Sequence, residues 1–331
     1  MTLSSYKIPN RFFAVLGLAC IIPLFVVAQP AHAQQSVEIV GSVESDSANK
    51  RQEQEETKAP VDESKLYSEH MRIRRDGRGR AIAMDTAVTR FELLNEDGKR
   101  VHVDLIGAVH IGEKEYYQAL NDRFEKYDAM LYELVAPEGT VIPKGGGGRD
   151  ITNPVAAMQV GMMSGLDLTF QLEEVDYTKD NFVHADMTPE EFAESWSKNN
   201  ESLGRILLKS IGQSMAMQQK GGASNLSLLS AMLSDNPTLA MRRIAAEQMA
   251  NMDAGMSVFE GDNGSTIIDH RNAKVIEVLQ RELDKGTTKI AIFYGAGHLK
   301  DLQRRLESDL KMKRGGKTWL EAWKLREEEK K

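Results

Sequence analysis

The chain has 331 residues, a net charge of −7 and a single cysteine, Cys20. Such an acidic surface disfavours nucleic acid and anionic membranes as partners, because both repel negative charge. One cysteine excludes an intramolecular disulfide, so stability must come from a hydrophobic core or a bound metal, and a chain of this length can bury such a core.

The first 33 residues have the pattern of a secretory signal peptide. Lys7 and Arg11 form a positive start, Phe12–Ala28 is an apolar run, and Ala31-His32-Ala33 is a small-x-small cleavage site. We therefore expect an exported protein, periplasmic or extracellular, whose mature chain begins at Gln34. An uncleaved segment would instead act as an N-terminal membrane tether, since about 17 apolar residues approach the length that spans a bilayer.

Residues 34–65 are predicted to be a disordered linker, because they are rich in Gln, Glu, Ser, Asp and Lys and have almost no aromatic residue. An α/β domain is assigned to residues 66–310. Its first part contains five arginines between Arg72 and Arg80, which we interpret as a solvated loop. Ordered structure is expected from about Thr86.

A β-hairpin and a β-α-β unit are predicted next. The runs Phe91–Leu94 and Val101–Ile106 flank Asp97-Gly98, which is a typical hairpin turn. Apolar residues at helical spacing predict a helix over 112–127, and Asp128–Val135 is typical of a buried strand. Such a unit usually forms a right-handed crossover between parallel strands.

The middle of the chain, from about residue 150 to 285, is predicted to be a largely helical insertion that holds eleven of the 16 methionines. Thr188-Pro189 in this segment marks a helix start. The fold class predicted for the whole domain is α/β, with a mixed, mostly parallel sheet that is flanked by helices and interrupted by this insertion.

The α/β pattern returns after the insertion. We expect a helix over 267–283, a strand over Lys289–Tyr294 and a helix over His298–Leu310. Residues 311–331 are predicted to be a C-terminal helical tail, because Trp319 and Trp323 stand four residues apart.

Two copies of one local pattern, Gly107-Ala108-Val109-His110 and Gly295-Ala296-Gly297-His298, point to chemistry. Each follows an apolar strand and precedes a helix, and ligands of open α/β sheets bind at that edge. Glu133 ends another apolar strand and needs a partner, because burying an unpaired carboxylate is costly. A single strand-end histidine is often only a structural hydrogen-bonding residue. The combination predicts a shared site of His110, Glu133 and His298.

Two neutral imidazoles and one carboxylate suit a divalent metal, Mn²⁺, Co²⁺, Zn²⁺ or Fe²⁺, and the residues do not choose among these ions. The chain has no His-Glu-x-x-His motif, so the site is not that of an ordinary zinc protease.

These motifs, together with Tyr132-Glu133-Leu134, Arg271-Asn272 and the Leu299 that follows the second histidine, resemble the TraB/PrgY/GumN family, which includes the TIKI metalloproteases. The resemblance runs from about Phe91 to Leu310. It implies an α/β core related to the erythromycin-esterase and ChaN-like proteins, with His110, Glu133 and His298 as the metal or catalytic residues.

The resemblance also implies roles for residues beyond these three. Arg271 would orient an oxyanion or the carboxylate, with Asn272 beside it. Asp176-Tyr177 and His184-Ala185-Asp186 are similar to a pattern in some bacterial members, and His184 and Asp186 would support the site or add metal ligands. On residue chemistry alone, Arg271 would be a surface ion-pairing residue and Asp186 a turn residue.

Three functions are compatible with these features. The first is an exported metal-dependent hydrolase, a peptidase acting on a peptide or small-molecule substrate. In it a metal would activate water and polarise an amide carbonyl, while Glu133 or a histidine would move protons. The second is a non-catalytic protein that captures a peptide signal in the same crevice. The third is a tethered envelope protein whose helical middle serves as an interaction module.

Overall fold

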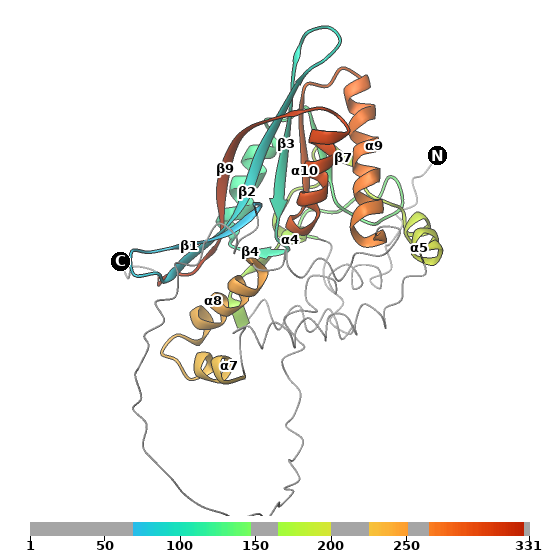
Figure 1. Ribbon diagram of the computed structural model, residues 1–331. Coiled ribbons are helices and arrows are strands. Elements are labelled where there is room, and N and C mark those ends of the chain that lie inside the picture. Colours follow the sequence, from blue (N-terminus) through green and yellow to red (C-terminus); the bar gives the residue numbers. More distant parts are fainter. Residues whose placement is uncertain (1–68, 147–164, 200–224, 251–264, 328–331) are drawn as a thin grey trace, which may run out of the picture.

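The computed structural model describes residues 69–146, 165–199, 225–250 and 265–327 (Figure 1). The predicted signal peptide (1–33) and linker (34–65) lie outside the described residues. Among the helices in these ranges, none combines the length and the apolar character needed to cross a membrane.

A seven-stranded mixed sheet forms the centre of the fold. Its order is β1-β2-β3-β8-β5-β7, and β9 pairs with β2 as well. Parallel pairs join β3, β8, β5 and β7, whereas β2 runs antiparallel to β1, β3 and β9. This sheet, mostly parallel and flanked by helices, confirms the predicted fold class. The strands are β1 (Met71–Arg75), β2 (Ala81–Leu94), β3 (Arg100–Ala108), β5 (Ala129–Tyr132), β7 (Phe182–His184), β8 (Lys289–Gly295) and β9 (Lys313–Lys324), with a separate pair formed by β4 (Ile111–Gly112) and β6 (Thr169–Phe170).

Helices cover both faces of the sheet. Neighbouring residues of a strand point to opposite sides, and in β3 and β8 both sides are apolar and need to be buried. Ile106 and Phe293 pack in the same cluster as residues of α2, whereas Leu105 and Ile292 pack with residues of α9 and α10. Figure 1 shows α9 and α10 beside the sheet, and α7 and α8 beyond one end of it. The described helices are α2 (Lys114–Phe124), α4 (Gln171–Glu174), α5 (Pro189–Lys198), α7 (Asn225–Met232), α8 (Pro237–Ala250), α9 (Arg271–Asp284) and α10 (Leu299–Ser308), with a π-helical turn η4 (Thr266–His270) and a 3₁₀ turn η5 (Ala296–His298).

The predicted hairpin and β-α-β unit are both present. β2 and β3 pair antiparallel around a turn in which Gly98 has φ of 73°, a left-handed conformation that glycine adopts without strain. α2 and β5 then follow. β5 runs in the same direction as β3, but β8 lies between the two strands and pairs parallel with each.

Ordered structure begins earlier than the predicted Thr86, and the arginine-rich stretch is not a solvated loop throughout. Its first residues form β1, where Met71 and Ile73 are buried and alternate with arginines. Arg72 Nε donates to Asp85 at 3.0 Å. Apolar residues and arginines alternate in Met71–Arg74, which is the pattern of a half-buried strand. The prediction counted the arginines and overlooked this alternation.

The prediction of a C-terminal helical tail over residues 311–331 is wrong for its described part, since β9 runs along β2. Trp319 and Trp323 are four residues apart, a spacing that suggested one helix face, but in β9 a register shift separates them, so that Trp319 stands opposite Ala87 and Trp323 opposite Met84. Trp323 is fully buried, and its Nε1 donates to the carbonyl of Ile111 at 2.7 Å. The tail is therefore part of the sheet and contacts the strand that follows His110.

In its described residues, 165–199, 225–250 and 265–285, the predicted insertion is helical only in part. α5 begins as expected, with Thr188 as N-cap and Glu191 completing a capping box. The same segment also supplies β7, which extends the main sheet beside β5. A strand of three residues is too short to show a period, so no sequence pattern predicted it.

Candidate functional site

The carboxyl ends of three strands bring three of the predicted residues to one edge of the sheet. His110 lies two residues after β3, Glu133 directly follows β5, and His298 ends the turn η5 after β8. His298 Nε2 lies 3.7 Å from Glu133 Oε1. The charge of His110 acts on both of these residues, so all three belong to one electrostatic neighbourhood.

Arg271 is the centre of this neighbourhood, and only 1% of its side chain is exposed. Its Nε and Nη2 donate to the two carboxylate oxygens of Asp186 at 2.9 and 2.5 Å. Nη2 also donates to Glu133 Oε1 at 2.8 Å, and Nη1 lies 3.4 Å from His298 Nε2. Arg271 is thus a buried hub rather than a surface ion-pairing residue, and Asp186 is its bidentate partner.

A π-helical turn places Arg271 at the site. The turn η4 directly precedes α9, and the first two residues of α9, Arg271 and Asn272, are both buried. Ser195 of α5 fixes the turn, since its Oγ lies 3.0 Å from Thr266 Oγ1 and 3.1 Å from His270 Nδ1. Such turns are frequent where a helix must re-aim side chains at a functional site.

Asn272 determines the proton position on His298. The Asn272 amide nitrogen donates to the backbone carbonyl of His298 at 3.1 Å and to Asp301 at 3.0 Å, so its oxygen is left to accept from His298 Nδ1 at 2.8 Å. The ring proton therefore sits on Nδ1, and the unprotonated Nε2 faces Glu133 and Arg271. Burial lowers the pKa of His298 from 6.5 to about 4, so the ring is neutral at pH 7.

Glu133 is ionised at neutral pH. Burial alone would raise its pKa, but the Arg271 guanidinium, the two histidines and the Gly295 N–H together lower that pKa below its usual 4.5. The Gly295 N–H donates to Glu133 Oε2 at 2.7 Å. With 12% of its side chain exposed, Glu133 also retains contact with solvent.

The first glycines of the two motifs provide space rather than an unusual backbone conformation. A Cβ on Gly295 would lie 3.2 Å from Glu133 Oε2, and a Cβ on Gly107 would lie 3.0 Å from Leu299 Cδ1. The φ of Gly295 is −50°, and Gly107 is not among the glycines with positive φ. Neither glycine is therefore required by the backbone conformation; each is required by a close neighbour, the Glu133 carboxylate at Gly295 and Leu299 of α10 at Gly107.

Gly295→Ala is expected to lower the free energy of unfolding by about 1–3 kcal/mol, because the new methyl group pushes Glu133 away from the Gly295 N–H. Urea unfolding of the purified mature chain measures this. Gly165→Ala is the matched control, since a Cβ at Gly165 has no heavy atom within 4 Å. Equal unfolding energies for the two variants would contradict the expectation.

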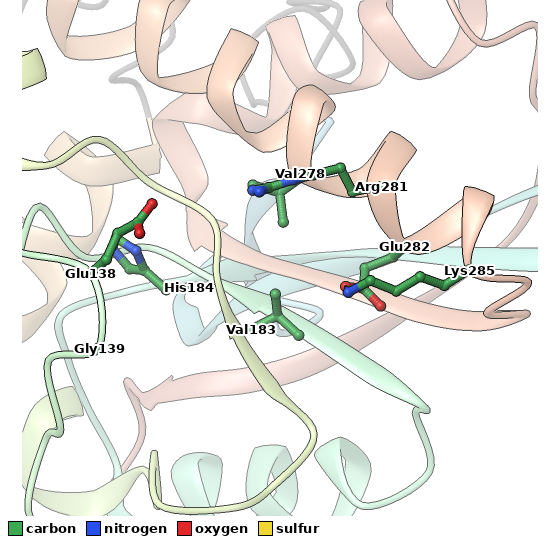
Figure 2. Close-up of a pocket in the computed structure, with 8 residues that line it drawn as sticks. All are labelled: Glu138, Gly139, Val183, His184, Val278, Arg281, Glu282 and Lys285. Carbon is green, nitrogen blue, oxygen red and sulfur yellow. The ribbon is translucent and has the colours of Figure 1, made fainter. Parts of the chain in front are cut away.

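His184 lies outside this network. Its Nε2 is 2.6 Å from the carbonyl oxygen of Leu134, and its ring lines a separate cavity of about 360 Å³. Figure 2 shows Val183 of β7 and Val278 of α9 facing one another in this cavity. Neither Arg271 nor His298 lines it. The residues that do are Glu138, Gly139, Val183, His184, Val278, Arg281, Glu282 and Lys285.

Asp301 is a site residue that the sequence analysis missed. It stands in the first turn of α10, three residues after His298, and accepts from Asn272. An acidic residue in a first helical turn is common for reasons of helix stability alone, so its position gave no separate indication of a site.

Arg271 occupies the position that a metal bound to both Glu133 and His298 would need. Its guanidinium lies 2.8 Å from Glu133 Oε1 and 3.4 Å from His298 Nε2, and the second oxygen of Glu133 already has a backbone donor. Within the part of the chain that the structure describes, no three His, Cys, Asp or Glu side chains form a group that could hold a metal ion. The donor set does not fit a divalent cation in this arrangement.

Comparison with known proteins provides no relative for this chain. No family model, no curated protein and no solved structure matches it. The resemblance to the TraB/PrgY/GumN family therefore rests on the short motifs alone.

Proposed function

We propose that the protein is an exported hydrolase of amide or peptide bonds, related to the TraB/PrgY/GumN family, whose site lies at the ends of β3, β5 and β8. The observation that carries the proposal is a buried, neutral His298 with its unprotonated Nε2 directed at Glu133 and Arg271. A base held in one tautomer beside a carboxylate and a guanidinium is an arrangement suited to acyl transfer to water.

In the proposed reaction, a water molecule transfers a proton to His298 Nε2 while its oxygen attacks the substrate carbonyl. Arg271 Nη1 donates to the oxyanion that forms on the former carbonyl oxygen. The ionised Glu133 stabilises the imidazolium, and Asn272 keeps the ring oriented through Nδ1. His298 then returns the proton to the leaving amine as the bond to the carbonyl carbon breaks.

Capture of a peptide without turnover is the second candidate, and one observation favours it. Both oxygens of Glu133 are already hydrogen-bonded, and Arg271 is paired on two sides. A carboxylate and a guanidinium with all these hydrogen bonds resemble a structural ion pair, which fixes the geometry of a binding site and does not transfer protons.

The proposal is tested by cleavage of a peptide pool with the purified, chelator-treated mature protein. We expect His298→Ala and Glu133→Gln to reduce cleavage by at least about 10²-fold, the usual contribution of a general acid–base group. His102→Ala is the control, because His102 lies on β3 and pairs with Glu92, outside the site. Mn²⁺, Co²⁺ or Zn²⁺ is then added back to each protein, and bound metal is measured.

Each result of this experiment selects one function. Cleavage without metal that is lost in both variants supports the proposed mechanism, whereas cleavage that returns only with metal supports the metal-dependent hydrolase expected from the motifs. Peptide binding without cleavage supports capture. A wild-type protein that neither binds nor cleaves peptides contradicts both candidates.

A further inference from the structure

The two-stranded ladder β4–β6 brings the backbone of a second polar residue, Gln171, next to that of His110. Ile111 pairs with Phe170 in antiparallel register, so Gln171 stands opposite His110, and its backbone N–H donates to the His110 carbonyl at 2.9 Å. Gln171 is the first residue of α4 and directly follows this ladder, so the backbone pairing holds the start of α4 against the backbone of His110.

The Gln171 amide is buried with one polar atom left over. The residue is 5% exposed, its Nε2 donates to the Tyr177 hydroxyl at 2.8 Å, and its Oε1 has no hydrogen-bond partner in the described part of the chain. If the amide were turned round, Tyr177 would donate to the oxygen and the NH₂ group would be left over instead. In either orientation, one half of a buried amide lacks a partner, which folding alone does not favour.

The partner of Gln171 connects it to the other side of the site. The Tyr177 ring packs against Tyr132 with ring centroids 5.4 Å apart, and Tyr132 directly precedes Glu133. Burial raises the pKa of the Tyr177 hydroxyl, and the charge of Glu133 raises it further, so Tyr177 lies within electrostatic reach of that carboxylate. Gln171 and Tyr177 thus link the His110 side of the site to the Glu133 side.

We propose that Gln171 is a substrate-binding residue whose side-chain amide hydrogen-bonds a peptide-type amide of the substrate beside the bond that is cleaved. The unpaired Oε1 of Gln171 accepts from the peptide N–H of the substrate, which is the group that an ester lacks. The proposal rests on the proposed hydrolase and adds recognition of the substrate backbone. Gln171 takes no part in proton transfer.

Binding is tested without turnover, in the mature chain carrying His298→Ala. The probes are N-acetyl-trialanine methylamide and an analogue in which one internal amide is replaced by an ester, and titrations follow the His110 ring signals by NMR. We expect the amide probe to bind at least about fivefold more tightly than the ester, and Gln171→Met to abolish that preference. Methionine keeps the volume and removes the unpaired polar atom, but it also removes the hydrogen bond to the buried Tyr177 hydroxyl, so stability to urea is expected to fall and the titration is made where urea unfolding shows the variant to be folded.

Thr89→Val is the matched control, because Thr89 Oγ1 is also buried without a partner in the described part of the chain but lies within β2, opposite Leu105. This variant is expected to keep the preference for the amide probe. A preference that survives Gln171→Met, an equal affinity of the parent for both probes, or no binding of either probe would overturn the proposal. Because no step of this test needs cleavage, a failure of the hydrolase proposal is seen separately, in the peptide-pool assay.

Discussion

Arg271→Ala is expected to lower the free energy of unfolding at pH 7 by about 3–5 kcal/mol, the usual loss when one partner of a buried ion pair is removed. The guanidinium donates to both oxygens of Asp186 and to Glu133, and none of the Asp186 side chain is exposed. Without Arg271, two carboxylates share a buried site with no cation between them. The variant should lose less at pH 4, because Arg271 no longer lowers the pKa of Glu133, which then takes up a proton and repels Asp186 less.

Urea unfolding of the wild-type and variant mature chains measures this loss. Arg304→Ala is the control, since Arg304 makes an exposed pair with Asp301 on α10, and such pairs contribute about 0–1 kcal/mol. The double variant Arg271→Met with Asp186→Leu should recover part of the loss, because apolar residues of similar volume replace a buried pair at little cost. If Arg271→Ala costs no more than Arg304→Ala, the guanidinium is not the buried hub described above.

The residues at the strand ends could be predicted from the sequence, because an apolar run and the polar residue after it are neighbours in the chain. His110, Glu133 and His298 each follow an apolar run, and the carboxyl ends of parallel strands meet at one edge in whatever order the strands pair. The insertion of β8 between β3 and β5 changed the order of the sheet without moving these three residues away from one another.

The partners of these residues could not be predicted, because they depend on pairings between distant segments. Asp186 meets Arg271 from 85 positions away in the chain, and its position depends on β7, a strand of three residues. Gln171 stands opposite His110 only because two strands of two residues pair in one register. Segments this short carry no periodicity, so only the folded chain shows which side chains they bring together.

The free energy of unfolding is expected to fall as the pH is lowered from about 6.5 to about 4, with His298 contributing up to about 3 kcal/mol of the loss. The pKa of His298 is about 4 in the fold and 6.5 by the reference value, so between these values the unfolded chain binds a proton that the folded chain does not. Protonation therefore favours unfolding. The contribution of His298 is complete above pH 6.5 and is lost as the pH falls toward 4.

Urea unfolding at pH 7 and at pH 4 measures this dependence in wild type and in His298→Gln. Burial also lowers the pKa of His70 to about 4, so wild type carries two such contributions, and His70→Gln serves as the comparison that removes the other one. We expect each variant to lose less stability than wild type between the two pH values. If His298→Gln and wild type lose the same amount, His298 is not held neutral by the fold, and its Nε2 is not the unprotonated base that the proposed hydrolysis needs.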